Sequence, residues 1–493
     1  MSIPADYISD LLNELSQGRL GNLITQADAR RILQEVKEIP ENYPDFDPFL
    51  TEKATHIAYV LLSCGCSLME ESNSNFTTTE SLSILERAGK LLSDVYKYND
   101  DEFDSKDYNL LISGMALYAA KQYSRAFIVL NKVNLDFIVG QMVIQFIKKD
   151  FNSLLQNVSQ VFFELPNELS DIQSLDEWVI SHEIARIFLM VVDFIQTGNQ
   201  SNFVSINSIF DKLLSIATES KLISYWLIVR LLKIILSTFQ EASLWTILPP
   251  LLPVQHIAEN YIRLLSGFKP AITELWPSQT TAIPLAVGEN NGGVINLRTS
   301  GGKTRVAEIA ILNTLSKHFM SKTLYLAPFR SLAFEVEQSL SKTFAPLGIT
   351  VSQLYGGSTA NVTDFELIKQ SQVIVATPEK AKALIRCGSE LESELKLIVI
   401  DEGHLLGAEE RYIKNEIFLT HVNEFASRNQ IKMLLLSAVL PNANELADWV
   451  AADTSLVAKS EWKPALERLG LLLWDGNRVR LEWESEGKPF NPN

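Results

Sequence analysis

The spacing of apolar residues changes once along the chain, near residues 249–270. Before that point apolar residues recur at intervals of three and four, as in Ile8, Leu11 and Leu15. This is the period of an amphipathic helix. After it, short β-prone runs alternate with helical patterns, which predicts a mostly parallel sheet with helices on its faces. The expected fold is therefore an all-α domain followed by a doubly wound α/β domain.

A proline-rich stretch, Leu248–Pro253, ends the helical pattern and marks the boundary. We expect an α-helical domain at residues 1–260, a parallel-sheet domain at 261–465, and a β-hairpin linker or the start of a further lobe at 466–493, turning at Asp475-Gly476. The predicted strands of the sheet are residues 294–297, 323–327, 349–354, 372–376, 396–400 and 432–436.

One segment of the helical half, residues 108–133, has the spacing of a helical hairpin. Small residues such as Gly114 would let two helices approach closely, and Tyr123 would fill the gap between them. The spacing fits a tetratricopeptide-like unit, but no second copy follows at a fixed period. An ordinary helical hairpin is an equally good interpretation.

Composition and charge narrow the class of protein. The 493 residues are 46% hydrophobic and 21% charged, which is typical of globular domains. Three cysteines give no disulfide framework and no signal peptide is evident, so we expect a cytoplasmic location. The apolar stretch 222–239 contains Arg230 and Lys233 and predicts a buried helix rather than a membrane span.

The negative charge is concentrated in the helical half. The whole chain carries a net charge of −16, of which −12 falls in residues 1–270 and −4 in 271–493. Neither half has the basic excess of a simple nucleic-acid binder, so any nucleic-acid track must be a local groove. The acidic half is better suited to a partner protein.

Residues 294–304 read Val-Ile-Asn-Leu-Arg-Thr-Ser-Gly-Gly-Lys-Thr, a short apolar run followed by small residues and then by a helical pattern. This order predicts a strand, a phosphate-binding loop and a helix, although Leu297 stands where the first glycine of such a loop is usual. Inward-turned backbone N–H groups and the helix dipole would bind the phosphates of ATP. The loop residues are Thr299, Ser300, Gly301 and Gly302; Lys303 would reach the β/γ-phosphates and Thr304 would ligate Mg²⁺.

A second apolar run, Leu397-Ile-Val-Ile, ends in Asp401-Glu402-Gly403-His404. A carboxylate at a strand tip is suited to hold Mg²⁺, which is the role expected for Asp401. Glu402 would orient and deprotonate an attacking water. Lys303, Asp401 and Glu402 are therefore the candidate catalytic residues, with Thr304 and Asp401 as the metal ligands.

Together with the phosphate loop, this DExH box resembles the first RecA-like lobe of superfamily 2 nucleic-acid helicases, in the branch of the exosome-associated and archaeal repair helicases. Other motifs follow in the order of that family. They are Trp276-Pro-Ser-Gln279, Tyr325-Leu-Ala-Pro-Phe-Arg330-Ser-Leu-Ala333, Gly356-Gly357, Ala376-Thr-Pro-Glu-Lys380 and Ser437-Ala-Val439.

The resemblance implies a role for each motif. Gln279 would read adenine, and His404 would connect the magnesium site to Ser437. One nucleic-acid strand, which we expect to be DNA, would be held mainly by its backbone. The residues implied for that contact are Arg330, Ser331, Gly356, Gly357, Thr377 and Pro378. Val439 replaces the usual Thr and removes a hydroxyl from the expected coupling between ATP and the strand.

The arginine-bearing element of a second RecA-like lobe is not visible in the sequence. We therefore expect either the front part of a longer helicase, which we favour, or a second lobe supplied by another chain. The leading hypothesis is an ATP-dependent helicase or translocase. The alternative is an ATP-gated scaffold that regulates a partner protein. A large helical domain before such a lobe also resembles helicases of bacterial anti-phage defence, including the Hachiman type, in which the motor restrains a nuclease.

Overall fold

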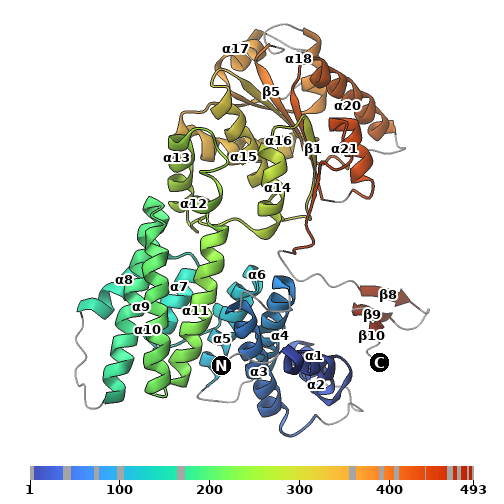
Figure 1. The fold of residues 1–493 in the computed structure, drawn as a ribbon. Helices are drawn as coiled ribbons and strands as arrows, with labels where there is room; N and C mark the ends of the chain where they lie inside the picture. Colours follow the sequence, from blue (N-terminus) through green and yellow to red (C-terminus); the bar gives the residue numbers. More distant parts are fainter. Residues whose placement is uncertain are drawn as a thin grey trace.

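A computed structural model describes most of the chain, and Figure 1 shows a helical domain joined to a lobe built on a β-sheet. The described residues are 5–36, 46–70, 77–96, 105–163, 172–354, 362–387, 393–404, 410–438, 440–463, 470–474, 479–485 and 488–490. The helices of the first half are α1 (Ala5–Gln17), α2 (Arg19–Val36), α3 (Leu50–Glu70), α4 (Thr78–Tyr96), α5 (Lys106–Ala119), α6 (Tyr123–Leu130), α7 (Ile138–Ile147), α8 (Phe151–Phe163), α9 (Ile172–Thr197), α10 (Ser201–Glu219), α11 (Ile223–Ala242), α12 (Leu244–Ile247) and α13 (Gln255–Ser266).

The segment with hairpin spacing forms α5 and α6. Gly114 lies directly under α6, where an added Cβ would meet the side chain of Leu130 at 2.4 Å. The ring of Tyr123 packs edge-on against Tyr118, with 5.0 Å between the ring centroids. A small residue on one helix and an aromatic residue on the other thus allow the two helices to pack closely.

By length and composition, α11 is the one helix in the described part of the chain that could cross a membrane. Within the fold, 56% of its most apolar window is buried. The Arg230 guanidinium on this helix forms an ion pair with Glu70, at 2.8 Å, and also bonds the hydroxyl of Ser67. These contacts are those of a helix packed inside a protein, where a buried cation needs a partner.

The predicted fold class is confirmed by a parallel sheet of seven strands, whose spatial order is β3-β4-β2-β5-β6-β1-β7. The six predicted strands are present with small shifts at their ends, and the short β7 at the edge was not foreseen. The strands are β1 (Gly292–Asn296), β2 (Lys322–Leu326), β3 (Val351–Leu354), β4 (Val373–Ala376), β5 (Leu395–Ile400), β6 (Lys432–Ser437) and β7 (Val457–Lys459). The lobe's helices are α14 (Pro277–Val287), α15 (Lys303–Lys317), α16 (Arg330–Phe344), α17 (Val362–Gln370), α18 (Pro378–Cys387), α20 (Glu410–Arg428) and α21 (Ala443–Ala451), with a 3₁₀ turn at Ala345–Leu347.

Alternate side chains of each strand enter two different cores. Ile295 and Val399 belong to the larger core, which includes α14, α15 and α16 and continues into the helical domain. Val294 and Ile398 belong to a smaller core, which includes residues of α18, α20 and α21. Because one hydrophobic core spans the helical domain and one face of the sheet, the two parts are held together by apolar burial.

The last described strands form a separate small sheet. Strands β8 (Gly470–Trp474), β9 (Val479–Ser485) and β10 (Lys488–Phe490) pair antiparallel, with Trp474 opposite Val479. Figure 1 shows this sheet apart from the seven-stranded one. The expected turn at Asp475-Gly476 lies outside the described residues.

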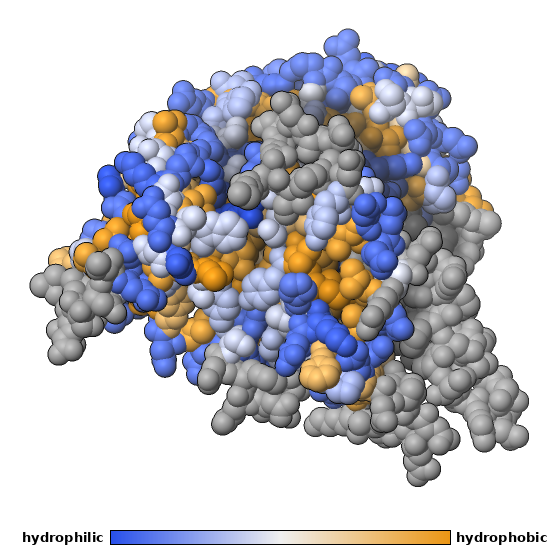
Figure 2. Space-filling model, turned by 60° about the horizontal axis from the view of Figure 1, so that its bottom comes forward, coloured by the Kyte–Doolittle hydropathy of each residue, from blue (hydrophilic) through white to orange (hydrophobic). Residues whose placement is uncertain are grey.

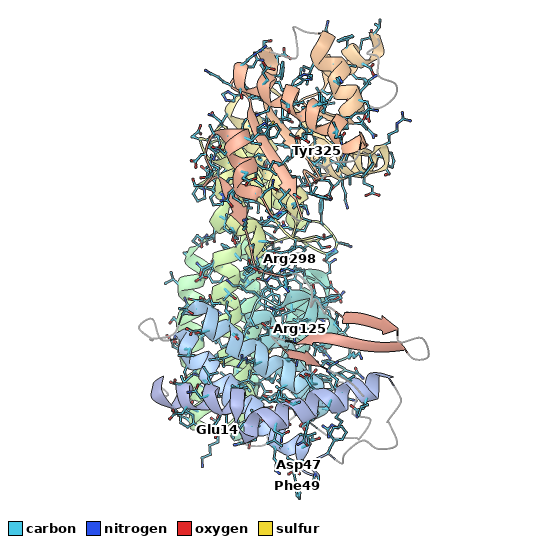
Figure 3. The ribbon with its side chains drawn as sticks, turned by 90° about the vertical axis from the view of Figure 1, so that its right-hand side faces the viewer. Glu14, Asp47, Phe49, Arg125, Arg298 and Tyr325 are labelled. Carbon is cyan, nitrogen blue, oxygen red and sulfur yellow. The ribbon has the colours of Figure 1, made fainter. Side chains whose placement is uncertain are left out.

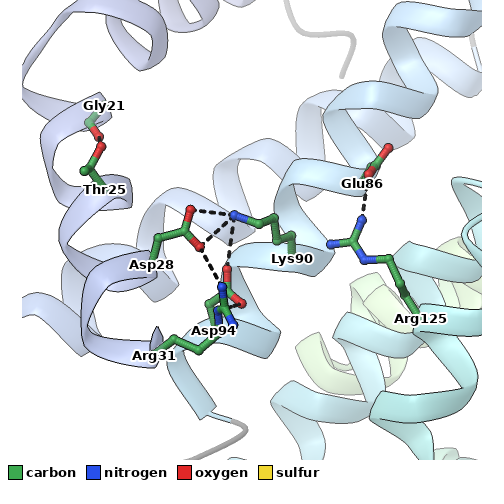
Figure 4. A network of polar contacts seen from close by, with 8 residues as sticks. All are labelled: Gly21, Thr25, Asp28, Arg31, Glu86, Lys90, Asp94 and Arg125. Atoms are coloured by element: carbon green, nitrogen blue, oxygen red, sulfur yellow. Dashed lines mark hydrogen bonds and ion pairs between the residues drawn. The ribbon is translucent and has the colours of Figure 1, made fainter. Parts of the chain in front are cut away.

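Figure 4 shows a buried ion network that joins α2 to α4. The Arg31 guanidinium lies 2.8 Å from Asp94, and the Lys90 ammonium lies 2.6 Å from Asp28. Burial raises the pKa of Asp94 to about 7, with the neighbouring Asp28 adding to the shift and the two cations opposing it. The network therefore depends on both cations to keep two carboxylates close together.

The surface of the helical domain carries exposed apolar side chains. Figure 2, which brings the lower side of the molecule forward, shows orange hydrophobic patches interrupted by blue hydrophilic residues. Among the described residues, large apolar side chains with more than 70% exposure in this domain are Phe163, Val204 and Ile223. Such residues are common on protein surfaces and by themselves assign no function.

We expect Arg31→Met to destabilise the helical domain by about 3 kcal/mol, because it leaves the buried Asp94 with one cation fewer. Arg186→Met is the matched control, since Arg186 pairs with Glu183 on a solvent-exposed face and should cost less than about 1 kcal/mol. Urea unfolding of both variants, followed by circular dichroism, measures the difference. Equal midpoints for the two variants would contradict the assigned role of the network.

Candidate nucleotide-binding site

The candidate site lies where three neighbouring strands end. In the sheet, β6 separates β1 from β5, and Asn296 at the end of β1 is in register with Ser437 at the end of β6. The backbone N–H of Gly403, just beyond β5, donates to the carbonyl of Leu436. Parallel pairing therefore brings the phosphate loop, Ser437 and the acidic pair to one edge of the sheet, which is where α/β proteins bind ligands.

The loop between β1 and α15 has the backbone of an anion-binding turn. Gly302, the residue before the first turn of α15, is left-handed with φ 82°, and Ser300 is also left-handed with φ 62°. A Cβ on Gly302 would lie 2.2 Å from the amide nitrogen of Gln279. The dihedral angle favours glycine here, and an added Cβ would also have to displace the Gln279 amide. The α15 N-terminus then directs its dipole toward this loop.

Leu297, where a glycine was expected, does not obstruct the loop. Its side chain is fully buried in the larger core, and its N–H donates to the carbonyl of Ser437. The Lys303 ammonium bonds the carbonyl of Leu297 at 3.3 Å. Only the backbone of Leu297 therefore contacts the phosphate loop, and its side chain points into the core.

The start of α14 also contacts the loop. The Ser278 hydroxyl donates to the carbonyl of Gly301 at 2.8 Å. The amide oxygen of Gln279 accepts from the N–H of Trp276 at 2.8 Å, and its amide nitrogen lies 3.5 Å from the carbonyl of Gly302. Gln279 is therefore held between its own helix start and the phosphate loop.

Two hydrogen bonds orient the Asp401 carboxylate. The Tyr325 hydroxyl donates to Oδ2 at 2.8 Å, and the N–H of Glu402 donates to Oδ1 at 2.9 Å. Glu402 itself is left-handed, with φ 52°. This sharp turn follows the end of β5 directly. It gives Asp401 and Glu402 different directions although they are adjacent in the sequence.

The electrostatics of this edge suit a bound cation. Burial raises the pKa of Asp401, and the neighbouring Glu402 adds to the shift, while the hydrogen bonds and the Lys303 charge oppose it. Burial lowers the pKa of Lys303, and the negative charges of Glu402 and Asp401 oppose that change. A divalent ion beside Asp401 would counter the charge of both carboxylates. Oxygen ligands from Asp401 and Thr304 are the type that Mg²⁺ prefers.

His404 lies between the acidic pair and β6. Its Nδ1 is 3.2 Å from Glu402 Oε2 and 3.3 Å from the Ser437 hydroxyl. The imidazole therefore contacts both residues through the same nitrogen. Val439, whose side chain lacks the usual hydroxyl, lies outside the described residues.

The residues expected to touch nucleic acid have different surroundings. Arg330 and Ser331 are exposed at the start of α16, whereas Thr377, just before α18, is 4% exposed. Pro378 lines a cavity of about 30 Å³ together with Pro328, Asp401 and Glu402. The segment before α16 and the start of α18 therefore line one cavity beside the acidic pair. Gly356 and Gly357 lie outside the described residues.

Sequence reasoning missed two residues of this site. Tyr325 was assigned no role, although it is the only aromatic residue of β2, which reads Lys-Thr-Leu-Tyr-Leu, and it orients Asp401. Ser278, next to Gln279, was likewise assigned no role.

In Figure 3, Tyr325 lies within the lobe, and Arg298 of the phosphate loop lies at the end of the lobe that faces the helical domain. Among the described residues, no group of three or more His, Cys, Asp or Glu side chains forms a metal site.

These features define a P-loop nucleotide-binding lobe with a RecA-like sheet. The sequence pattern of the DEAD/DEAH box helicase family matches residues 276–446. Residues 276–446 therefore match the helicase domain of that family, which confirms the resemblance drawn from the motifs. This class of domain is an ATPase-type domain that binds nucleic acid.

Two known proteins resemble this chain, one over almost its whole length and the other over less than half of it. Hachiman protein HamB of Bacillus cereus is 36% identical over 475 residues, which is 96% of this chain and 42% of that protein. The ATP-dependent DNA helicase Hel308 of Thermococcus kodakarensis is 36% identical over 222 residues, covering 43% of this chain and 19% of that protein. The chain thus spans less than half the length of either relative.

Among solved structures, the DEAD-box helicase Mss116 bound to single-stranded RNA is similar with 22% identity and a TM-score of 0.36. The match covers 43% of this chain and 44% of that one.

We expect Gly302→Ala to weaken ATP binding at least about 10-fold, because its Cβ would displace Gln279 and disturb the loop. Gly348→Ala is the matched control. Its φ is 77°, so it shares the backbone strain of about 1 kcal/mol, but no atom lies within 4 Å of its added Cβ. Titration with a fluorescent ATP analogue measures both. An equal loss in the two variants would show that strain alone, and not the loop contact, weakens binding.

Proposed function

We propose that this chain is the ATP-binding first motor lobe of an ATP-dependent nucleic-acid helicase or translocase, together with a helical partner-binding domain. The observation that carries the proposal is the meeting of Lys303, Asp401 and Ser437 at one edge of the sheet. Lys303 would bind the β/γ-phosphates, which the helix dipole of α15 also favours. Bound Mg²⁺, held by Thr304 and Asp401, would offset the charge that develops on the transferred phosphate.

The remaining residues of the site suit the steps around that transfer. Glu402 would position the attacking water and accept its proton, since it is next to the metal ligand and half-exposed. His404 contacts both Glu402 and Ser437, so it would transmit a conformational change at the bound phosphate to β6. The backbone N–H groups at the starts of α16 and α18, with Arg330, would hold one strand of nucleic acid, which we take to be DNA.

We expect Glu402→Gln to keep ATP binding and to lower ATP turnover about 10²-fold or more, because only the proton acceptor is lost. Lys303→Ala should instead lose ATP binding itself. Glu335→Gln, at an exposed position of α16, is the matched control and should leave both quantities unchanged. Phosphate release by the full-length protein, with and without single-stranded DNA, measures turnover. No stimulation by DNA or RNA at low salt would overturn the helicase proposal.

We expect Arg330→Ala to raise the amount of single-stranded DNA needed for half-maximal stimulation and to lower the salt slope of binding by about 1, because one phosphate contact is removed. Arg428→Ala removes another exposed arginine, at the end of α20, where it pairs with Glu424. That control should bind as the unaltered protein does. An unchanged salt slope in Arg330→Ala would remove Arg330 from the nucleic-acid track.

A second candidate function is an ATP-gated scaffold that restrains a partner, such as a nuclease in anti-phage defence. The similarity to the Hachiman protein extends across the helical domain, whereas the similarity to the repair helicase covers less than half of this chain. The acidic charge of residues 1–270 supports a partner-protein role for that domain. The variants Glu402→Gln and Lys303→Ala distinguish the two candidate functions. Protection of cells that survives Glu402→Gln but not Lys303→Ala favours gating by bound ATP over unwinding.

A further inference from the structure

The entry to the motor lobe, residues 273–276, is fastened to the helical domain by its backbone. The N–H of Leu244 donates to the carbonyl of Thr273, and the N–H of Leu275 donates to the carbonyl of Ala242. These bonds place Glu274 against the junction of α11 and α12, where it forms an isolated antiparallel bridge with Ser243. Backbone bonds on both sides leave this short segment little freedom.

The Glu274 side chain is bound by two residues of the helical domain. The Lys149 ammonium lies 2.6 Å from Oε1, and the Tyr118 hydroxyl donates to the same oxygen. Lys149 also bonds the Tyr118 hydroxyl at 2.8 Å. Both charged side chains are nearly buried, with 12% exposure for Lys149 and 8% for Glu274. Breaking one partner of such a pair leaves an uncompensated buried charge.

Aromatic rings fix the position of the Lys149 ammonium. It lies 4.7 Å from the ring centroid of Phe146 and 4.9 Å from that of Phe239, with Tyr118 at 5.3 Å. The rings attract the cation and restrict its side-chain rotamers. Glu274 therefore meets a preorganised cation that comes from the turn between α7 and α8, outside the motor lobe.

The segment by which the chain leaves the lobe also contacts this part of the helical domain. The Trp462 indole N–H donates to the carbonyl of Lys121, between α5 and α6, at 2.9 Å. Its ring lies 6.2 Å from that of Tyr123 and 5.6 Å from that of Trp276. Trp276 is thus held by an aromatic contact on one side and follows Glu274 by two residues.

Gln279 is the end of this series of contacts. The N–H of Trp276 occupies its amide oxygen, and its amide nitrogen faces the carbonyl of Gly302. The direction of the amide therefore depends on where Trp276 is held, and Trp276 depends on Glu274 and Trp462. A displacement of the Gln279 amide by about 1 Å can remove much of its contribution to nucleobase recognition.

We propose that Glu274 is a positioning residue for nucleobase selection: Lys149 and Tyr118 of the helical domain fix it so that Gln279 can distinguish adenine from guanine. This rests on the proposed reading of adenine by Gln279. The helical domain would then set how selectively the motor lobe takes ATP, without touching the nucleotide.

The test compares the affinities of ATP and GTP, measured by competition with a fluorescent nucleotide on the full chain. Lys149→Met, Glu274→Gln and the milder Tyr118→Phe should each lower the preference for ATP, the first two by about 10-fold. Glu86→Gln is the matched control, because it breaks the Arg125–Glu86 pair, at 2.6 Å, between α4 and α6 without touching the motor lobe. It should keep the preference of the unaltered protein.

Gln279→Ala separates the two levels of the proposal. If it lowers the preference while the Lys149, Glu274 and Tyr118 variants retain it, the positioning role is overturned and adenine reading stands. If Gln279→Ala retains the preference, adenine reading by Gln279 fails and the positioning role fails with it. Equal losses of ATP and GTP affinity in the Glu274 and Lys149 variants would indicate a structural contact only and would also overturn the positioning role. Tyr118→Phe, which removes one hydroxyl, serves if the charged variants do not fold.

Discussion

Parallel pairing of β1, β6 and β5 is the constraint on which the rest of the structure depends. It sets Asn296 beside Ser437 and ties Gly403 to Leu436, so the phosphate loop and the acidic pair flank a single strand end. Moving one strand by one residue would reverse which face each side chain enters. The two cores that take alternate side chains hold that register, and the site thus inherits its geometry from apolar packing.

The shared hydrophobic core joins the helical domain to the nucleotide-binding lobe more firmly than a linker would. Core residues continue from the helical domain through α13 to α15 and one face of the sheet. Tyr261 of α13 bonds the buried Glu308 of α15, on the helix that begins at the phosphate loop. A domain joined in this way can affect the nucleotide site through packing, which suits either a motor or an ATP-gated scaffold.

The departures from the family's usual motifs have local explanations where the structure describes them. Leu297 fits because the loop side needs only its carbonyl, while its side chain is fully buried in the larger core. Gln279, expected to face adenine, is also bonded to Trp276 and close to Gly302. These contacts connect Gln279 with the loop and with the segment that enters the lobe.

The sequence by itself determined the order of elements and the chemistry. Six of the seven strands of the large sheet follow from short β-prone runs, and those in the middle of the sheet are mostly apolar because they are buried on both faces. The short β7 carries too few residues for a period to be read. Glycine, lysine and acidic residues at strand ends indicated a phosphate and metal site, since few other uses need those groups in that order. Only the tertiary structure brought Tyr325 to Asp401, and Lys149 and Tyr118 to Glu274. These partners lie 76, 125 and 156 positions apart in the chain, and no local pattern records a contact made by folding over such distances.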